Sequence, residues 1–393
     1  MRVLLAVADW PWPPRKGHRL RTLQLAAALA RRHQVTLLAP GAAGAEAGEL
    51  AGAIERYRPV RWGFLPALLG ALGSGRALEG ALFAGGHFHR RLAELAPRAD
   101  RVVLQLARLA SVAPQLGTTP FYVDLIDCLS LNLERRAAFE RRWARPLVAW
   151  EARRMAADEC RLVGASAGAF VVCERDRRHL VDRVGLAEGK VHLLPLVVEP
   201  RDFRAAERPA APPDRPRLIV TGNLGYFPTA EGIGWLLTEI WPELRARWPG
   251  LRLQVAGSRP GGKLRRLLGA SGGELVEDPA DLGALLRGAD VALVPLRAGS
   301  GTPIKLLEAM AVGIPAIATR WAVAGVDAEL APFVAAADSP AEWRAALAGL
   351  LGDWERATAR AAAGRRRLLE LHAAERLAAT LEKVLEEEPV EVP

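Results

Sequence analysis

Short apolar runs alternate with amphipathic segments in the first part of the chain. Residues 2–8 have the continuous apolar pattern of a buried parallel strand, residues 18–32 have helical periodicity, and residues 35–39 form the next apolar run. This order of strand, helix and strand predicts a βαβ unit, which opens a doubly wound α/β sheet. Ligands of such sheets bind beyond the carboxyl ends of the strands, so the loop 9–17 is expected to face a cleft.

Further strands are predicted at residues 101–106 and 120–126. The last strands and helix of this part are expected within 162–165, 171–176 and 191–195. Between them, residues 134–157 carry a long helical pattern with many arginines and with apolar residues such as Trp143 and Leu147, and we expect a kink or break at Pro146. The apolar side of this segment either packs on its own domain or lies on an anionic membrane surface, and the pattern leaves both open.

A change in composition divides the chain. Residues 199–216 are rich in proline, alanine and charged residues, as in a linker between domains. A second series of strands is predicted after it, at 217–221, 251–256 and 274–277, and the tail from 339 to 388 has a charged helical pattern. Two α/β domains are therefore expected.

The most informative stretch is ADVALVPLRAGSGTPIKLLEAMAVGIPAIATR, residues 289–320. It predicts a strand at 290–296, a glycine-containing loop at 298–303, a helix at 304–312 and a strand at 316–319. Unpaired N–H groups at the start of that helix favour a phosphate, Lys305 adds positive charge, and Glu308 can accept hydrogen bonds from sugar hydroxyls. The alternative is an ordinary turn in which Lys305 and Glu308 form a surface pair.

The segment GSGTPIKLLEAMAVGIPAIAT resembles the nucleotide-sugar motif of family 4 glycosyltransferases, in the version of the exopolysaccharide-associated sugar transferases. WPWPPRKGHRLRTLQLAAALARRHQVTLL resembles their N-terminus. The resemblance implies the GT-B fold, with two doubly wound Rossmann-like domains facing across a cleft. The expected domains are 1–205 for the acceptor, 206–372 for the nucleotide sugar, and a C-terminal helix within 373–393 that crosses back to the first domain.

By this resemblance the expected catalytic residues are Lys305, Glu308, His18 and Asp127, with helix capping as the alternative role of Asp127. Lys16 and Arg21 are expected beside His18. Residues expected at the donor are Gly17, Asn223, Arg259, Val276, Ser300, Gly301, Thr302, Pro303 and Ile304, together with Lys305 and Glu308.

The chain departs from the family pattern at several positions. Many members have a glutamate where this chain has Ser300, and an arginine where it has Asn223. An Asn-Gly-Val that usually follows the last strand of the first domain is replaced by Leu196-Val197-Val198. These changes alter the expected contacts to the donor.

The resemblance implies a retaining hexosyltransferase that moves a sugar from a nucleotide-diphosphate donor to a glycan, lipid-linked or small-molecule acceptor, in polysaccharide or glycoconjugate biosynthesis. Two alternatives remain: a GT-B relative such as a UDP-sugar epimerase, and a nucleotide-sugar-binding protein without catalysis.

Charge and cysteine content narrow the partners and the compartment. The 393 residues carry a formal net charge of +9, but the basic residues are dispersed and no aromatic stacking platform accompanies them, so a nucleic-acid partner is not expected. The three cysteines lack metal-ligand spacing, and no DxD motif is present, so no metal or other cofactor is expected. The cysteine usage favours a cytoplasmic protein, either free or peripheral on the inner face of the cell membrane.

Overall fold

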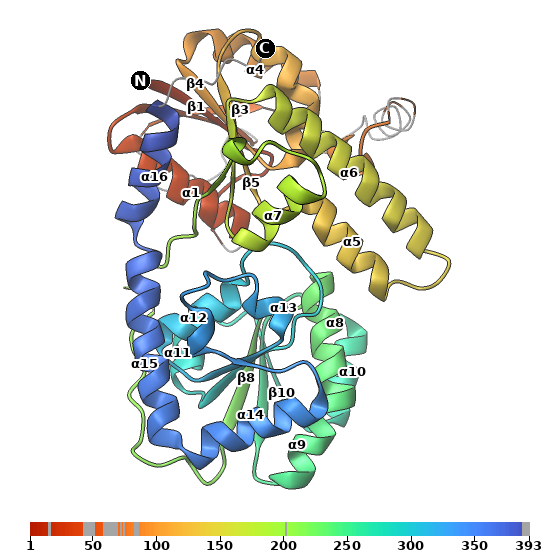
Figure 1. The fold of residues 1–393 in the computed structure, drawn as a ribbon, viewed down its shortest axis with the longest axis vertical. Coiled ribbons are helices and arrows are strands. Elements are labelled where there is room, and N and C mark those ends of the chain that lie inside the picture. The colour runs from red at the N-terminus through yellow and green to blue at the C-terminus, as the bar shows by residue number, and fades with distance from the viewer. Residues whose placement is uncertain are drawn as a thin grey trace. The chain divides into compact units, whose positions relative to one another are not determined.

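The computed structural model describes residues 1–14, 17–41, 52–57, 70, 73, 75–81, 86–200 and 203–386. The chain divides into two compact units, Met1–Val197 with Ala374–Pro393, and Val198–Ala373. Each unit is a parallel β-sheet with helices packed against it (Figure 1).

The sheet of the first unit has the order β3-β2-β1-β4-β5-β6-β7, and all of its pairs are parallel. Its strands are β1 (Arg2–Ala6), β2 (Gln34–Pro40), β3 (Ala53–Tyr57), β4 (Arg101–Gln105), β5 (Phe121–Ile126), β6 (Gly168–Val171) and β7 (Val191–Leu193). The chain runs outward from β1 to β3 and then crosses to β4, so its direction of winding reverses between β1 and β4.

Helices cover this sheet and complete its core. They are α1 (Gly17–Ala30), α3 (Leu78–Ala81), α4 (Gly86–Leu95), α5 (Leu129–Phe139), α6 (Arg145–Ala165), α7 (Glu174–Asp182) and α16 (Ala374–Glu386). The last helix, α16, places Leu377 and Leu381 in one apolar cluster with Leu5 of β1 and Leu25 of α1. The C-terminal helix is therefore part of the first unit's core.

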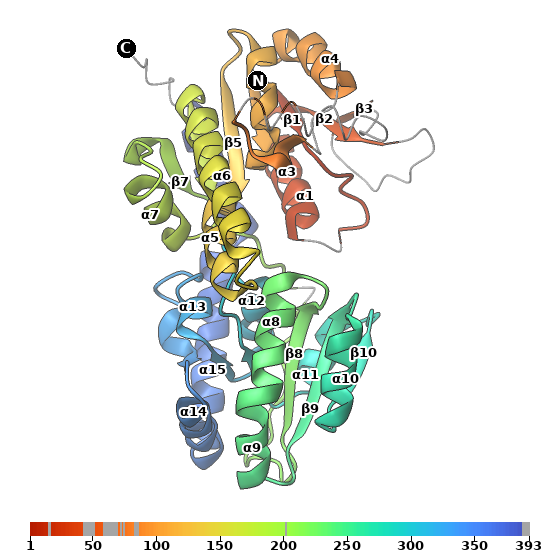
Figure 2. The same cartoon turned by 90° about the vertical axis from the view of Figure 1, so that its right-hand side faces the viewer.

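The second unit repeats the same architecture, with the order β10-β9-β8-β11-β12-β13 and parallel pairing throughout. Its strands are β8 (Arg217–Asn223), β9 (Arg252–Ser258), β10 (Glu274–Glu277), β11 (Val291–Val294), β12 (Ala316–Ala318) and β13 (Ala335–Ala336). Its helices are α8 (Phe227–Trp235), α9 (Trp241–Arg247), α10 (Gly262–Ala270), α11 (Leu282–Arg287), α12 (Ile304–Val312), α13 (Arg320–Val323), α14 (Pro340–Gly352) and α15 (Trp354–Leu371). Figure 2 shows α8 and α10 along this sheet, which reverses its winding between β8 and β11.

The second unit begins at Val198 rather than at the expected residue 206. Backbone hydrogen bonds explain the earlier start: Val198 N donates to His372 O at 3.0 Å and Ala206 N donates to Val312 O at 2.9 Å. The Arg208 guanidinium also donates to carbonyl oxygens that precede β11. Part of the apparent linker is thus tied into the second unit.

Two sequence predictions in the first unit need correction. Residues 162–165, expected as a separate element among the last strands and helix, instead end helix α6, where Leu162 and Val163 are buried. Of 171–176, only Val171 belongs to a strand, because α7 begins at Glu174. The break expected near Pro146 within the helical pattern 134–157 is confirmed: α5 and α6 are separate helices, and Pro146 lies in the first turn of α6.

Candidate functional site

The strongest candidate site lies in the second unit, where the winding reverses between β8 and β11. A loop leaves β11 and leads to α12, which begins at Ile304 as predicted. The helix ends at Gly313, whose φ of 77° is the left-handed conformation typical of a helix C-terminus. Lys305 and Glu308 therefore lie in the first two turns of a helix at the ligand-binding edge of the sheet.

Lys305 is held at a defined place by the segment after β8. Its Nζ donates a hydrogen bond of 2.7 Å to Thr229 Oγ1, in the first turn of α8. A Cβ at Gly222 would lie 2.9 Å from the same Nζ, and the φ of Gly222 is 137°. Glycine at the end of β8 therefore leaves the space that the ammonium group occupies.

Burial shifts the pKa values of Lys305 and Glu308. Burial lowers the pKa of the Lys305 ammonium to about 8, although the Glu308 carboxylate opposes the shift. Burial likewise raises the pKa of Glu308 to about 7, against the effect of Lys305. An anionic ligand at Lys305 would favour the charged form of the lysine and replace the solvent that it has lost.

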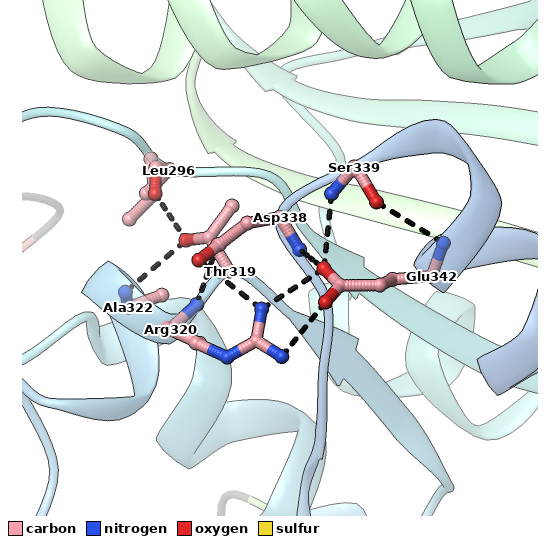
Figure 3. A network of polar contacts seen from close by, with 7 residues as sticks. All are labelled: Leu296, Thr319, Arg320, Ala322, Asp338, Ser339 and Glu342. Carbon is pink, nitrogen blue, oxygen red and sulfur yellow. Dashed lines mark hydrogen bonds and ion pairs between the residues drawn. The ribbon is translucent and has the colours of Figure 1, made fainter.

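The loop before α12 is fixed by hydrogen bonds from the segment after β12 (Figure 3). Thr319 Oγ1 donates to Leu296 O and accepts from Ala322 N. Trp321 Nε1 donates to Gly299 O at 3.1 Å. Beside them, Arg320 donates to the carboxylates of Asp338 and Glu342. The loop is thus a supported part of the fold.

Helix α8 supports the same loop from the other side. A Cβ at Gly232 would lie 2.1 Å from Pro295 O, so only glycine permits this approach of α8 to the end of β11. Arg297 forms an ion pair with Glu231, and its guanidinium carbon lies 4.5 Å from the ring centroid of Trp235. The backbone around the candidate site is closely packed.

The other residues expected at the donor lie in the loop before α12, at the start of that helix, and on or after neighbouring strands. Ser300, Gly301 and Thr302 lie in the loop, Pro303 is the N-cap of α12, and Ile304 is its first residue. Asn223 ends β8 next to Gly222, and its Oδ1 accepts from Gly225 N at 3.1 Å.

Arg259 and Val276 lie on the β9 and β10 side of the sheet. Arg259 is exposed just after β9, and its carbonyl oxygen would lie 2.9 Å from a Cβ at Gly225. Arg259 therefore adjoins the turn after β8. Val276 is on β10, which is separated from β8 by β9, so it lies further from Lys305.

In the first unit, the start of α1 gathers charged groups around Asp9. Gly17 is the first residue of α1, and a 2.9 Å hydrogen bond joins His18 Nε2 to Asp9 Oδ2. Arg19 donates to both carboxylate oxygens, at 2.9 and 3.0 Å. Burial alone raises the pKa of Asp9, but hydrogen bonds from His18 and Arg19 outweigh it and hold the pKa below its usual range. Lys16 lies outside the described residues.

Arg21 does not belong to an accessible site, contrary to expectation. Its side chain and that of Asp124 are both fully buried and form an ion pair of 3.1 Å. The remaining N–H groups donate to the carbonyl oxygens of Leu194 and Pro195. Arg21 therefore links α1, β5 and the segment after β7 inside the first unit.

Asp127 follows β5 at the carboxyl edge of the sheet, two strands from β1. The N-cap position of α5 is Cys128, and its side chain makes no capping bond. Instead Glu159 of α6 accepts from the backbone N–H groups of Leu129 and Ser130, at 2.8 and 3.2 Å. Glu159 therefore caps the start of α5.

Sequence reasoning missed several residues that position the predicted ones. Thr229, Gly222 and Asp9 each adjoin a predicted site residue, at Lys305 or at His18. The sequence could have indicated them, because all three lie at the end of the first predicted strand of a domain or in the segment that follows it. Among the described residues, no group of three or more His, Cys, Asp or Glu side chains is placed to hold a metal ion.

Comparison with known proteins supports this architecture. Residues 215–353 match the sequence model of the family described as glycosyl transferases group 1. No curated protein sequence matches the chain significantly.

Solved structures resemble the chain over its full length. Anabaena HepE in complex with UDP has a TM-score of 0.70 at 13% identity, covering 99% of this chain and 100% of that one. A UDP-forming trehalose-phosphate synthase from Burkholderia vietnamiensis has a TM-score of 0.66 at 14% sequence identity, covering 99% of this chain and 100% of that one. A glycosyltransferase from Rickettsia africae has a TM-score of 0.65 at 12% sequence identity, covering 98% of this chain and 99% of that one. The chain thus has the GT-B fold of two Rossmann-like units, and its second unit contains the segment that matches group 1 glycosyltransferases.

Proposed function

We propose that the protein transfers a sugar from a nucleotide-diphosphate donor to an acceptor hydroxyl. The observation that carries this proposal is Lys305, a cation held by Thr229 against Gly222 where the winding of the second sheet reverses. A leaving diphosphate needs such a fixed positive charge when it departs from the sugar. The match of residues 215–353 to group 1 glycosyltransferases supports the same reaction.

The proposed donor site is built from the loop and helix after β11. Lys305 and the N–H groups of residues 301–304 neutralise the diphosphate, and Glu308 accepts hydrogen bonds from the ribose hydroxyls. Asn223 and Arg259 complete the phosphate surroundings in this unit. Ser300, Thr302 and Pro303 shape the loop beside the sugar, and backbone near Val276 meets the base.

The finer assignment is a retaining hexosyltransferase of family 4 in polysaccharide or glycoconjugate biosynthesis, with a glycan, lipid-linked or small-molecule acceptor. UDP is the first nucleotide to test, because HepE was solved with UDP-glucose. We propose that the reaction does not require a metal ion. The free thiols Cys128, Cys160 and Cys173 fit a cytoplasmic location.

In the proposed reaction, the bond from the anomeric carbon to the diphosphate oxygen breaks and the acceptor oxygen bonds to that carbon. The acceptor proton passes to the leaving phosphate, so no side-chain base is required. His18, oriented by Asp9, and Asp127 are proposed to position the acceptor. Replacing either by alanine should then raise KM for the acceptor more than it lowers donor hydrolysis.

The test is release of nucleoside diphosphate from a panel of UDP-, GDP- and ADP-sugars, with and without EDTA and with lipid extract as a source of acceptor. Lys305→Ala is expected to lower release about 100-fold, because it removes a charge that stabilises the transition state. Glu308→Ala should also lower it. Lys263→Ala and Glu239→Ala, at exposed positions of the same unit, are the matched controls.

The outcomes of this test distinguish a glycosyltransferase from a nucleotide-sugar-binding protein and from an epimerase. Binding of UDP without release from any donor would replace the proposal with a binding protein. Formation of a sugar epimer without an acceptor would identify an epimerase. Full activity in Lys305→Ala would exclude the proposed donor site.

A further inference from the structure

The hairpin of α5 and α6 ends in an exposed tip, residues 140–147, which projects from the first unit (Figure 1). Trp143 is 74% exposed and Leu147 is 58% exposed. Arg145 N donates to Arg141 O at 3.1 Å, so the tip is a helical turn and the two apolar side chains lie one turn apart. Two large apolar side chains exposed together are characteristic of a contact surface.

The charge of the tip is strongly biased. Arg141, Arg142 and Arg145 are exposed, and the only acidic residue, Glu140, pairs with Arg136 at 2.8 Å. Arg145 donates to the carbonyl oxygens of Ala138 and Glu140, where it closes the end of α5. Arg141 and Arg142 thus surround the apolar side chains with positive charge.

The base of the hairpin is fixed inside the first unit. Glu159 of α6 is fully buried and joins α6 to the start of α5 through Leu129 N, Ser130 N and Ser130 Oγ. On the same helix, Met155, Leu162 and Val163 are also buried. The tip is therefore carried by an anchored pair of helices and loses little conformational freedom when it binds.

We propose that this tip docks on the surface of an anionic lipid bilayer, with Trp143 and Leu147 in the interfacial region and Arg141 and Arg142 on lipid phosphates. Tryptophan favours the membrane interface, and each arginine gains about fivefold in partitioning near anionic headgroups. A stable protein interface buries about 800 Å² on each partner, far more than two side chains provide, whereas a bilayer needs no matching shape. No helix among the described residues is long and apolar enough to cross a bilayer.

The experiment is sedimentation of the full chain with vesicles of phosphatidylcholine alone or of equal parts phosphatidylcholine and phosphatidylglycerol. The wild-type chain should bind the anionic vesicles, and added salt should weaken binding. Arg141→Gln with Arg142→Gln should weaken it roughly thirtyfold, and Trp143→Ala with Leu147→Ala should also weaken it. The matched control is Arg90→Gln with Arg153→Gln, two exposed arginines of the same unit outside the tip.

Circular dichroism of each variant, together with its UDP affinity, checks the fold and the second unit separately from vesicle binding. The proposal is overturned if the wild-type chain ignores anionic vesicles, or if both tip variants bind as the wild type does. It is equally overturned if the control pair loses as much binding as the arginine pair, because general charge would then suffice. None of these outcomes depends on sugar transfer.

Discussion

The Lys305 ammonium group loses its proton at a lower pH than an exposed lysine does. Because burial lowers its pKa to about 8, the free protein loses this charge as the pH rises through that value. Binding of a diphosphate requires the charged form, so Lys305 should not limit the affinity for UDP below pH 8. Above it, affinity should fall by up to about tenfold per pH unit.

Isothermal titration of UDP at pH values on both sides of 8 measures this dependence. Lys305→Ala should bind more weakly and lack the decline above pH 8, while Lys263→Ala, an exposed lysine of α10, should keep it. The same decline in both variants would assign the titration to another group.

The sequence was sufficient to predict that Lys305 and Glu308 lie at a helix start, because they belong to a contiguous motif. It could not supply Thr229 and Gly222, which reach Lys305 only when β8 and β11 become neighbours in the sheet. It was misleading for Arg21, because a basic residue in a first helical turn is usually solvated. Here Asp124, distant in sequence, compensates its burial.

At the scale of elements, the sequence predicted correctly where pattern and end signals agreed. The bounds of β10 and α12 are those predicted, and the glycine after α12 marks its end. Residues 162–165 were not recognised as the end of α6, because a short apolar run does not distinguish a strand from the buried side of a helix. The break between α5 and α6 was predicted correctly, because Pro146 is compatible with the first turn of a new helix but not with the interior of a long one.

The α5–α6 hairpin should depend on Glu159. This side chain is fully buried and accepts hydrogen bonds from Leu129 N, Ser130 N and Ser130 Oγ. Glu159→Ala leaves these donors unsatisfied and should lower the free energy of unfolding of the first unit by about 3 kcal/mol. Glu159→Gln keeps an acceptor oxygen and should cost about 1 kcal/mol. Urea unfolding measures both, and equal losses would contradict the capping role.

The C-terminal segment completes the first unit, since the chain leaves this unit after Val197 and returns to it at Ala374. Such a return could be expected from the resemblance to GT-B enzymes, but not which side chains perform it. Leu377 and Leu381 are each 1% exposed and pack with Leu25 and Leu29 of α1. Two ion pairs, Arg31 with Glu375 and Arg32 with Glu382, lie at the surface and add little.

We therefore expect Leu381→Ala to destabilise the first unit by about 3 kcal/mol, because it removes buried apolar surface and leaves a cavity. Leu193→Ala, at a position on β7 that is 41% exposed, should change stability by less than about 0.5 kcal/mol. Hydrogen exchange followed by mass spectrometry locates the effect. In Leu381→Ala, peptides from β1 and α1 should exchange faster, while peptides from β8 and α12 keep their protection. Faster exchange in the second unit instead would mean that α16 stabilises the protein through contacts other than its packing on α1.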